Sequence, residues 1–178
     1  SHVTETLENA GFEAYLIGGC VRDMLLERRP KDWDVTTNAT PEQIVALFPN
    51  TFYENDYGTV GVVNEEEGID PTLKVVEVTP YRIEGKYSNN RHPDEVKWSN
   101  NIMDDLDRRD FTVNAIALRV KDGKSAIIDP HNGQSDLKLR EIKTVGNPHE
   151  RFREDGLRIL RAVRIASDLE FSIDPATE

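Results

Sequence analysis

Short apolar stretches alternate with polar and turn-forming residues along the first two thirds of the chain, and this pattern predicts a β-sheet with a few helices. The expected strands are AYLIGG (14–19), DWDVTT (32–37), TFYE (51–54), TVGVVN (59–64), LKVVEVTPYR (73–82), NAIALRV (114–120) and SAIIDP (125–130). Because several of them follow one another without a helix between, we expect a mixed sheet rather than a parallel βαβ series. The pattern therefore indicates the α+β class.

Helical periodicity in this part of the chain is confined to short segments, namely 3–10, 20–27, 41–48 and the residues after Ile102. The third segment has a clear start signal. Thr40 is a capping residue, Pro41 occupies the first helical position, and Gln43 follows the cap by three residues, which together are typical of a helix N-terminus.

The pattern changes twice further along the chain. Residues 83–100 show no sustained period and contain Gly, Pro, Asn and Ser, so we expect a long loop, a kind of segment that is commonly functional or disordered. Residues 149–169 have the periodicity of one long uninterrupted helix. We therefore place a domain boundary near residue 145, with one domain over 1–145 and a helical segment over 146–178.

The charge of the chain is unevenly distributed. The whole sequence has a net charge of −11, but the segment 108–164 contains 13 Lys and Arg against 8 Asp and Glu. A basic segment within an acidic chain is either a solvated helical face or a surface for a polyanionic ligand. The net charge alone therefore does not exclude a nucleic-acid partner.

Composition restricts the protein class. Hydrophobic residues make up 37 % and charged residues 31 %, and no apolar run approaches the roughly 20 residues that cross a bilayer. Cys20 is the single cysteine, which excludes an internal disulfide and gives no reason to propose a zinc cluster. We expect a globular protein of the cytoplasm without a membrane partner.

The stretch LIGGCVRD places two glycines between a predicted strand and a predicted helix. At Gly18 and Gly19 the missing side chains allow backbone N–H groups to approach phosphate oxygens, and Arg22, one turn into the helix, could bind the same phosphates. A glycine pair is also a common packing device. The stretch lacks the P-loop pattern and the full GxGxxG pattern, so the motif alone leaves both interpretations open.

Two aspartates follow on the next predicted strand. Asp32 and Asp34 are one residue apart and therefore share a face, where they are either solvated or able to bind divalent metals together. Mg²⁺ prefers one or two carboxylates with water and substrate phosphates as its other ligands. The order of a glycine turn, an arginine and two aspartates favours phosphate chemistry assisted by metal ions.

Four motifs now stand in order along the chain. They are LIGGCVRDMLLERRPKDWDVTT (16–37), DLDRRDFTVNAIA (105–117), DPHNGQSDLKLREI (129–142) and RFREDGLRILRAVR (151–164). With them the chain resembles the class II tRNA nucleotidyltransferase and bacterial poly(A) polymerase family, which includes the CCA-adding enzymes. The resemblance implies a nucleotidyltransferase head, with flanking helices on a mixed, mainly antiparallel sheet, and then the start of an all-helical neck.

The resemblance also implies an activity. Enzymes of this family add CMP and AMP from CTP and ATP to the 3′ end of tRNA without a nucleic acid template, use two Mg²⁺ ions and release pyrophosphate. Three alternatives remain open, namely an A-adding enzyme, a poly(A) polymerase, and a non-catalytic nucleotide- or RNA-binding module on the same scaffold. Family members are roughly twice as long as this chain, so we expect the missing body and tail to supply most of the tRNA contact. The oligomeric state is open.

The resemblance assigns roles to residues of the first two motifs. Asp32 and Asp34 match the metal-binding aspartates, and Gly19 and Arg22, together with Gly18 in the same turn, match the part that holds the triphosphate. Glu77 either helps to activate the 3′-hydroxyl or is an exposed residue of the sheet without a catalytic role. Further nucleotide contacts are expected from Arg109, Asp110 and Asn114, which otherwise would form an ion-pair network at a helix end.

The last motif is expected to choose the nucleobase. In the family the pair that corresponds to Asp155 and Arg158 selects C or A, because a carboxylate accepts from an exocyclic amine and a guanidinium donates to ring acceptors. Arg161 and Arg164 match positions that contact the nucleotide. Without the resemblance these side chains, one turn apart, read as a solvated and salt-bridged helix face.

Overall fold

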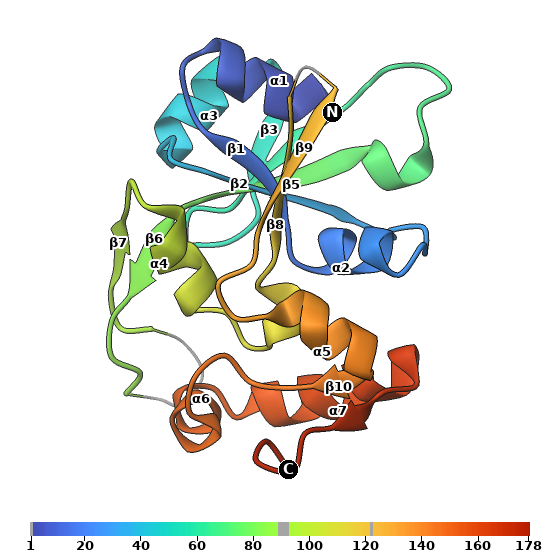
Figure 1. Cartoon of the computed structure of the whole chain (residues 1–178). Helices are drawn as coiled ribbons and strands as arrows, with labels where there is room; N and C mark the ends of the chain where they lie inside the picture. Colours follow the sequence, from blue (N-terminus) through green and yellow to red (C-terminus); the bar gives the residue numbers. More distant parts are fainter. Residues whose placement is uncertain (1, 89–92, 122) are drawn as a thin grey trace.

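The computed structural model describes residues 2–88, 93–121 and 123–178, and its centre is a seven-stranded sheet (Figure 1). The strand order is β3-β4-β5-β2-β1-β8-β9, and only the contact between β2 and β5 is parallel. The strands are β1 (Ala14–Ile17), β2 (Trp33–Thr37), β3 (Thr51–Tyr53), β4 (Val60–Val63), β5 (Val75–Pro80), β8 (Ala117–Lys121) and β9 (Lys124–Ile128). The predicted mixed, mainly antiparallel α+β fold is therefore confirmed.

Helices and two small sheets surround these strands. The α-helices are α1 (His2–Asn9), α2 (Gly19–Leu25), α3 (Pro41–Leu47), α4 (Ile102–Asp107), α5 (Gly133–Leu139), α6 (Pro148–Glu154) and α7 (Leu157–Leu169). Two 3₁₀ turns, η1 (Pro71–Leu73) and η2 (Thr112–Asn114), and the strand pairs β6 (Arg82–Glu84) with β7 (Val96–Trp98) and β10 (Glu141–Ile142) with β11 (Ser172–Ile173) complete the set. Helix α3 begins with the predicted capping box of Thr40 and Gln43.

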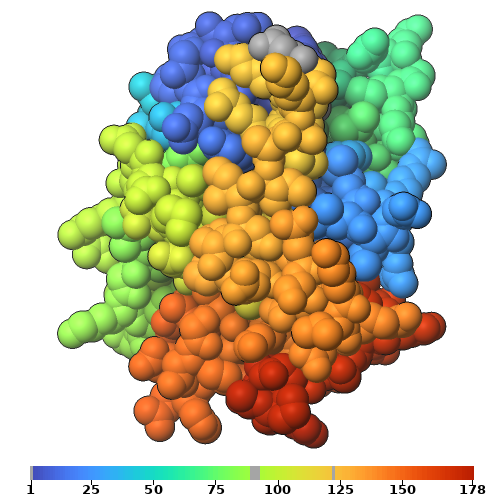
Figure 2. All heavy atoms as spheres, in the orientation of Figure 1, coloured from blue at the N-terminus to red at the C-terminus, as the bar shows by residue number. Residues whose placement is uncertain are grey.

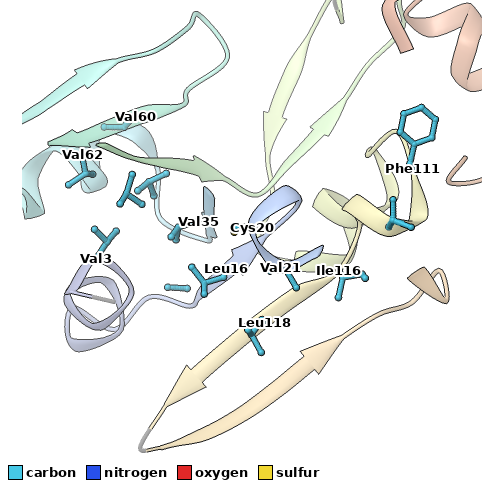
Figure 3. Packing of buried hydrophobic residues seen from close by; sticks show 14 of the residues in the cluster. Val3, Leu16, Cys20, Val21, Val35, Val60, Val62, Phe111, Ile116 and Leu118 are labelled. Carbon is cyan, nitrogen blue, oxygen red and sulfur yellow. The ribbon is translucent and has the colours of Figure 1, made fainter. Parts of the chain in front are cut away.

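The two faces of the sheet carry different residues. Val35, Val60, Val62 and Val78 point into the main hydrophobic core (Figure 3 labels the first three). Because successive residues of a strand point to opposite faces, the side chains between these valines lie on the other face. That second face carries a smaller hydrophobic cluster beneath α4, and next to it the polar side chains of Asp34, Thr36, Glu77 and Thr79 on β2 and β5.

The C-terminal segment lies against the rest of the chain. In Figure 2 residues after about 130, coloured orange to red, cover the lower part of the visible face. The segment is not helical throughout, because β11 pairs in parallel with β10. The boundary near residue 145 stays a prediction. No helix in the described ranges is long and apolar enough to cross a membrane.

The prediction of one helix over 149–169 is wrong. The chain forms α6 and α7, separated at Asp155 and Gly156, because the backbone of Asp155 is extended (φ −145°, ψ 108°). The Asp155 Oδ1 accepts a hydrogen bond from the Leu157 N–H at 2.9 Å. Aspartate competes with helix continuation through such local bonds, and glycine has low helix propensity.

Other boundaries differ as well. The expected loop 83–100 contains most of β6 and all of β7, which pair from Arg82 with Trp98 to Glu84 with Val96; residues 89–92 lie outside the described ranges. The strand expected over 73–82 ends at Pro80. The strand expected over 114–120 begins at Ala117, after the η2 turn. Strands of three residues are too short to produce a readable alternation.

Candidate active site

Two carboxylates lie side by side on the polar face of the sheet. Asp34 on β2 is paired in register with Glu77 on β5, and residues paired in this way share a face. Their neighbours Val35 and Val78 are fully buried on the opposite face. Asp32 lies one residue before β2 rather than within it. The predicted acidic pair therefore gains Glu77 as a direct neighbour of Asp34.

The carboxylates of Asp32, Asp34 and Glu77 repel one another. The pKa of Asp34 is raised to about 6, chiefly by burial; the Arg109 guanidinium opposes this shift, and the Asp32 charge adds to it. The pKa of Glu77 is raised by burial and by the charges of Asp34, Glu54 and Asp32. In the described ranges no hydrogen bond or ion pair ends on the carboxylate oxygens of Asp32, Asp34 or Glu77.

These carboxylates fit a divalent cation that brings its own phosphate ligands. Within the described residues no three His, Cys, Asp or Glu side chains are grouped closely enough to hold a metal ion by themselves. Mg²⁺ needs only one or two carboxylates when substrate phosphates and water complete its octahedron. The carboxylates of Asp32 and Asp34, whose oxygens accept no hydrogen bond from the described residues, suit that ligand set.

The glycine turn faces the carboxylates directly. Gly18 has a φ of +73°, and a Cβ atom there would lie 3.2 Å from Nη1 of Arg109 and 3.7 Å from Oδ2 of Asp34. A side chain at Gly18 would therefore be strained and would crowd the Arg109 guanidinium. Gly19 begins α2. The backbone of Gly18 thus lies next to both the Arg109 guanidinium and the Asp34 carboxylate.

A chain of hydrogen bonds links α2 to α7. Arg22 Nη1 donates to Asn114 Oδ1 at 2.9 Å, and Asn114 Nδ2 donates to Asp110 Oδ1 at 3.5 Å. Arg161 Nε donates to Asp110 Oδ2 at 2.7 Å. Arg22 also binds Asp23. Four predicted residues from separate parts of the sequence thus form one network.

Two cavities adjoin this network. The first has a volume of about 230 Å³ and is lined by seven of the predicted residues, Gly19, Arg22, Asp32, Asp34, Asn114, Arg161 and Arg164. The second, of about 330 Å³, is lined by Arg109, Asp110, Asp155, Arg158 and Arg161 among others. Arg161 borders both. Gly18 and Glu77 line neither of these two cavities.

Asp155 and Arg158 are arranged differently from the prediction. They do not lie on one helix, because Asp155 precedes α7. Arg158 is 7 % exposed and donates to Glu154 Oε2 at 2.6 Å, to the Arg151 carbonyl at 3.1 Å and to the Arg108 carbonyl at 3.4 Å. Its guanidinium also lies 5.9 Å from the Tyr87 ring centroid. Both residues line the second cavity, but Arg158 is held by protein acceptors.

Asp105 is a site residue that the sequence reasoning missed. It is fully buried and accepts from Arg109 Nη2 at 3.0 Å, from Arg108 Nε at 2.9 Å and from the hydroxyl of Thr36 on β2 at 3.2 Å. The nearby positive charges lower the pKa of Asp105 against the effect of its burial. Asp105 therefore connects α4 to the sheet and fixes Arg109 beside Gly18.

Asp105→Asn is expected to lower the free energy of unfolding by about 3 kcal/mol, because Arg108 and Arg109 lose a buried charged partner. Chemical denaturation measures this effect. Asp107→Asn is the matched control, since Asp107 ends the same helix with an exposed side chain. An unchanged free energy of unfolding in Asp105→Asn would contradict the role of Asp105 in connecting α4 to the sheet.

Comparison with known proteins shows the family of the chain. The sequence model of a family described as "Poly A polymerase head domain" matches residues 14–143. The chain belongs to this family. The matched range of the head domain contains the carboxylates, the glycine turn and the Arg109 segment, whereas Asp155, Arg158, Arg161 and Arg164 lie beyond it.

Individual relatives extend the similarity over the whole chain. A CCA-adding enzyme of Limosilactobacillus reuteri is 46 % identical over 176 residues, which is 98 % of this chain and 41 % of the relative. The crystal structure of the Bacillus stearothermophilus CCA-adding enzyme in complex with CTP is 40 % identical, has a TM-score of 0.85, and is matched over 99 % of this chain and 40 % of that one.

A more distant solved structure is a tRNA nucleotidyltransferase complexed with a primer tRNA and an incoming ATP analog. It is 28 % identical with a TM-score of 0.73, over 98 % of this chain and 47 % of that one. This head-domain chain therefore spans less than half the length of the relatives it matches.

Proposed function

We propose that this chain is the catalytic head and the start of the neck of a CCA-adding tRNA nucleotidyltransferase, which transfers CMP and AMP from CTP and ATP to a tRNA 3′ end. One observation carries the proposal. The carboxylate row of Asp34 and Glu77 faces a glycine turn and Arg109, and Asp32 and Asp34 share a cavity with the arginines of α7. The names of the relatives support the substrate class.

Phosphate binding is assigned to the side of the site that contains the guanidinium groups of Arg22 and Arg109. The N–H groups at Gly18 and Gly19 and the guanidinium groups of Arg22 and Arg109 converge where a triphosphate would meet Asp34. Asn114 and Asp110 fix the orientation of Arg22 and Arg161 and would accept hydrogen bonds from a ribose. The site therefore binds and orients the nucleotide before any bond changes.

Asp32 and Asp34 would hold two Mg²⁺ ions, which supply an activated 3′-hydroxyl and charge neutralisation for the departing pyrophosphate. The carboxylates themselves orient the reacting groups. Glu77, with its raised pKa, is placed to accept a hydrogen bond from the hydroxyl beside Asp34. The hydroxyl oxygen bonds to the α-phosphorus as the bond to pyrophosphate breaks.

Base choice is assigned to the second cavity. Asp155 and Arg158 lie on its wall, and Arg161 and Arg164 extend along α7 toward the triphosphate side. For Arg158 to donate to a base edge it must exchange part of its contact with Glu154 and the two carbonyls. Reading a base is therefore coupled to the junction between α6 and α7.

The expected contact with tRNA follows from the charge of this chain and from the greater length of its relatives. The chain is acidic overall, so the regions that the longer relatives possess beyond the matched part are expected to supply most of the contact with tRNA phosphates. The basic segment over 108–164 contributes the part next to the reacting end. A reaction that uses CTP, ATP and tRNA supports the prediction of a cytoplasmic protein.

Nucleotide incorporation tests the function directly. The complete natural polypeptide that contains this sequence is incubated with Mg²⁺ and tRNA transcripts that end before CCA, at CC or at CCA, each with CTP or ATP. We expect two C residues, then one A, and no further growth. Growth of homopolymer A on unrelated RNA would favour a poly(A) polymerase, which the name of the matched family keeps as a candidate. An inactive protein that still binds CTP would favour a binding module.

A further inference from the structure

The row of side chains that contains Asp34 and Glu77 continues toward the edge of the sheet. Glu77 on β5 is paired in register with Gly61 on β4, and Gly61 is paired with Phe52 on β3. Residues paired across neighbouring strands share a face, so Phe52, Gly61, Glu77 and Asp34 lie in one line. Val60 and Val62 point into the core from the other face (Figure 3).

The Phe52 ring lies flat across the glycine. A Cβ atom at Gly61 would lie 2.4 Å from Cζ of Phe52 and 2.5 Å from its Cε1, so the ring occupies the space above the Gly61 backbone. Phe52 is nevertheless 42 % exposed. Since neighbouring strands are about 4.8 Å apart, the ring lies roughly one strand spacing from the Glu77 backbone. Because Gly61 has no side chain, the Phe52 ring can lie against its backbone while one face of the ring stays open beside the carboxylates.

The charges around the ring select the chemistry of its ligand. Glu77 follows Gly61 in the row, and Glu54 lies close enough to Glu77 for their charges to interact, so carboxylates lie beyond the ring on the side of the site. Carboxylates repel phosphate but accept hydrogen bonds from hydroxyl and amine groups. An aromatic face with such neighbours suits a stacked nucleobase whose ribose hydroxyls point toward Glu77.

The order of the strands indicates which nucleotide would stack on Phe52. The cationic groups for the triphosphate, Arg109 and Arg22, lie beside the Gly18 turn that follows β1, whereas Phe52 lies at the opposite end of the row on β3. In-line displacement requires the attacking hydroxyl and the leaving pyrophosphate on opposite sides of the α-phosphorus. The attacking strand must therefore approach from the side of Phe52.

We infer that Phe52, seated on Gly61, is a stacking platform for the terminal nucleobase of the RNA acceptor, placing its 3′-hydroxyl over Glu77 and Asp34. This inference rests on the proposed function, and it adds the acceptor subsite to it. The platform binds any base, because every base has an aromatic face. It therefore serves an acceptor whose terminal base changes as nucleotides are added.

Steady-state kinetics of the complete natural polypeptide tests the platform. Phe52→Ala is expected to raise the KM for an RNA acceptor roughly tenfold and to leave the KM for CTP unchanged. Phe52→Trp should restore the acceptor KM, and Phe52→Leu should not. Gly61→Ala should act like Phe52→Ala, because its methyl group displaces the intact ring. Tyr53→Ala, on the opposite face of β3, is the matched control.

A binding measurement separates this inference from the proposed function. A short RNA ending in 2-aminopurine is titrated with the wild-type protein and with Phe52→Ala, and fluorescence quenching reports stacking without catalysis. Quenching that depends on Phe52 in a protein that transfers no nucleotide would support the platform and overturn the function. Normal transfer with equal acceptor KM and equal quenching in Phe52→Ala or Phe52→Leu would overturn the platform alone.

Discussion

Asp34→Asn is expected to lower the rate of nucleotide transfer about a thousandfold and, at the same time, to stabilise the metal-free protein. In the proposed mechanism the rate falls because the variant loses a charge that would hold the Mg²⁺ ions, which contribute several kcal/mol to stabilising the transition state. Stability rises because the ionised Asp34 is buried beside Asp32 and Glu77 in the folded protein. The charge to which the proposed mechanism gives a catalytic role therefore opposes folding.

The pH dependence follows from the sign of the pKa shift. The folded protein holds the pKa of Asp34 at about 6, and the unfolded chain has it near its ordinary value of about 3.9. The unfolded state therefore loses its proton first, and the wild-type free energy of unfolding falls between about pH 4 and pH 6 by on the order of 2 kcal/mol. In Asp34→Asn this decrease is absent.

Transfer assays and thermal melts at pH 4 to 8 measure both effects. Asp34→Asn should melt several degrees above the wild type at pH 7 and close to it at pH 4, and saturating Mg²⁺ with CTP should reduce the difference. Asp56→Asn, an exposed change in the turn between β3 and β4, controls for loss of one carboxylate. A wild-type transfer rate in Asp34→Asn would remove Asp34 from the mechanism.

The sequence predicts the parts of the site that depend on local order. A strand, a glycine pair and a helix follow one another in 14–25, and the alternation around Asp34 requires its side chain to leave the valine core. These features need no knowledge of distant contacts. The pairing of Asp34 with Glu77 needs the order of the strands, which residue patterns alone do not determine.

The sequence does not predict features that depend on competition between a local hydrogen bond and helix formation, or on the register between two strands. Periodicity continues on both sides of Asp155, so only the observed bond from its carboxylate to Leu157 shows where the helix breaks. Asp105 did leave a signal, since it shares a helical face with Ile102 and Leu106, both buried. The stacking of Phe52 on Gly61 depends on the register of β3 with β4, which the turn between them does not reveal.

Arg158→Ala is expected to reduce discrimination among the four nucleoside triphosphates by about tenfold to a hundredfold and to lower stability by about 2 kcal/mol. A guanidinium that donates to a base edge contributes about 1–3 kcal/mol of discrimination. The stability loss has a separate cause, because Arg158 holds Glu154 and the carbonyls of Arg151 and Arg108 and so ties α6 to the segment after α4.

Two variants separate these roles of Arg158. Glu154→Gln weakens the 2.6 Å contact but keeps the guanidinium, so it should lower stability while base choice persists. Arg153→Ala removes an exposed arginine from α6 and should change neither property. The measurements are kcat/KM for each triphosphate and the thermal midpoint. Suppose that Arg158→Ala has a lowered thermal midpoint but prefers CTP and ATP to the same degree as the wild type. Arg158 then only stabilises the junction between α6 and α7, and other residues that line the second cavity must select the base.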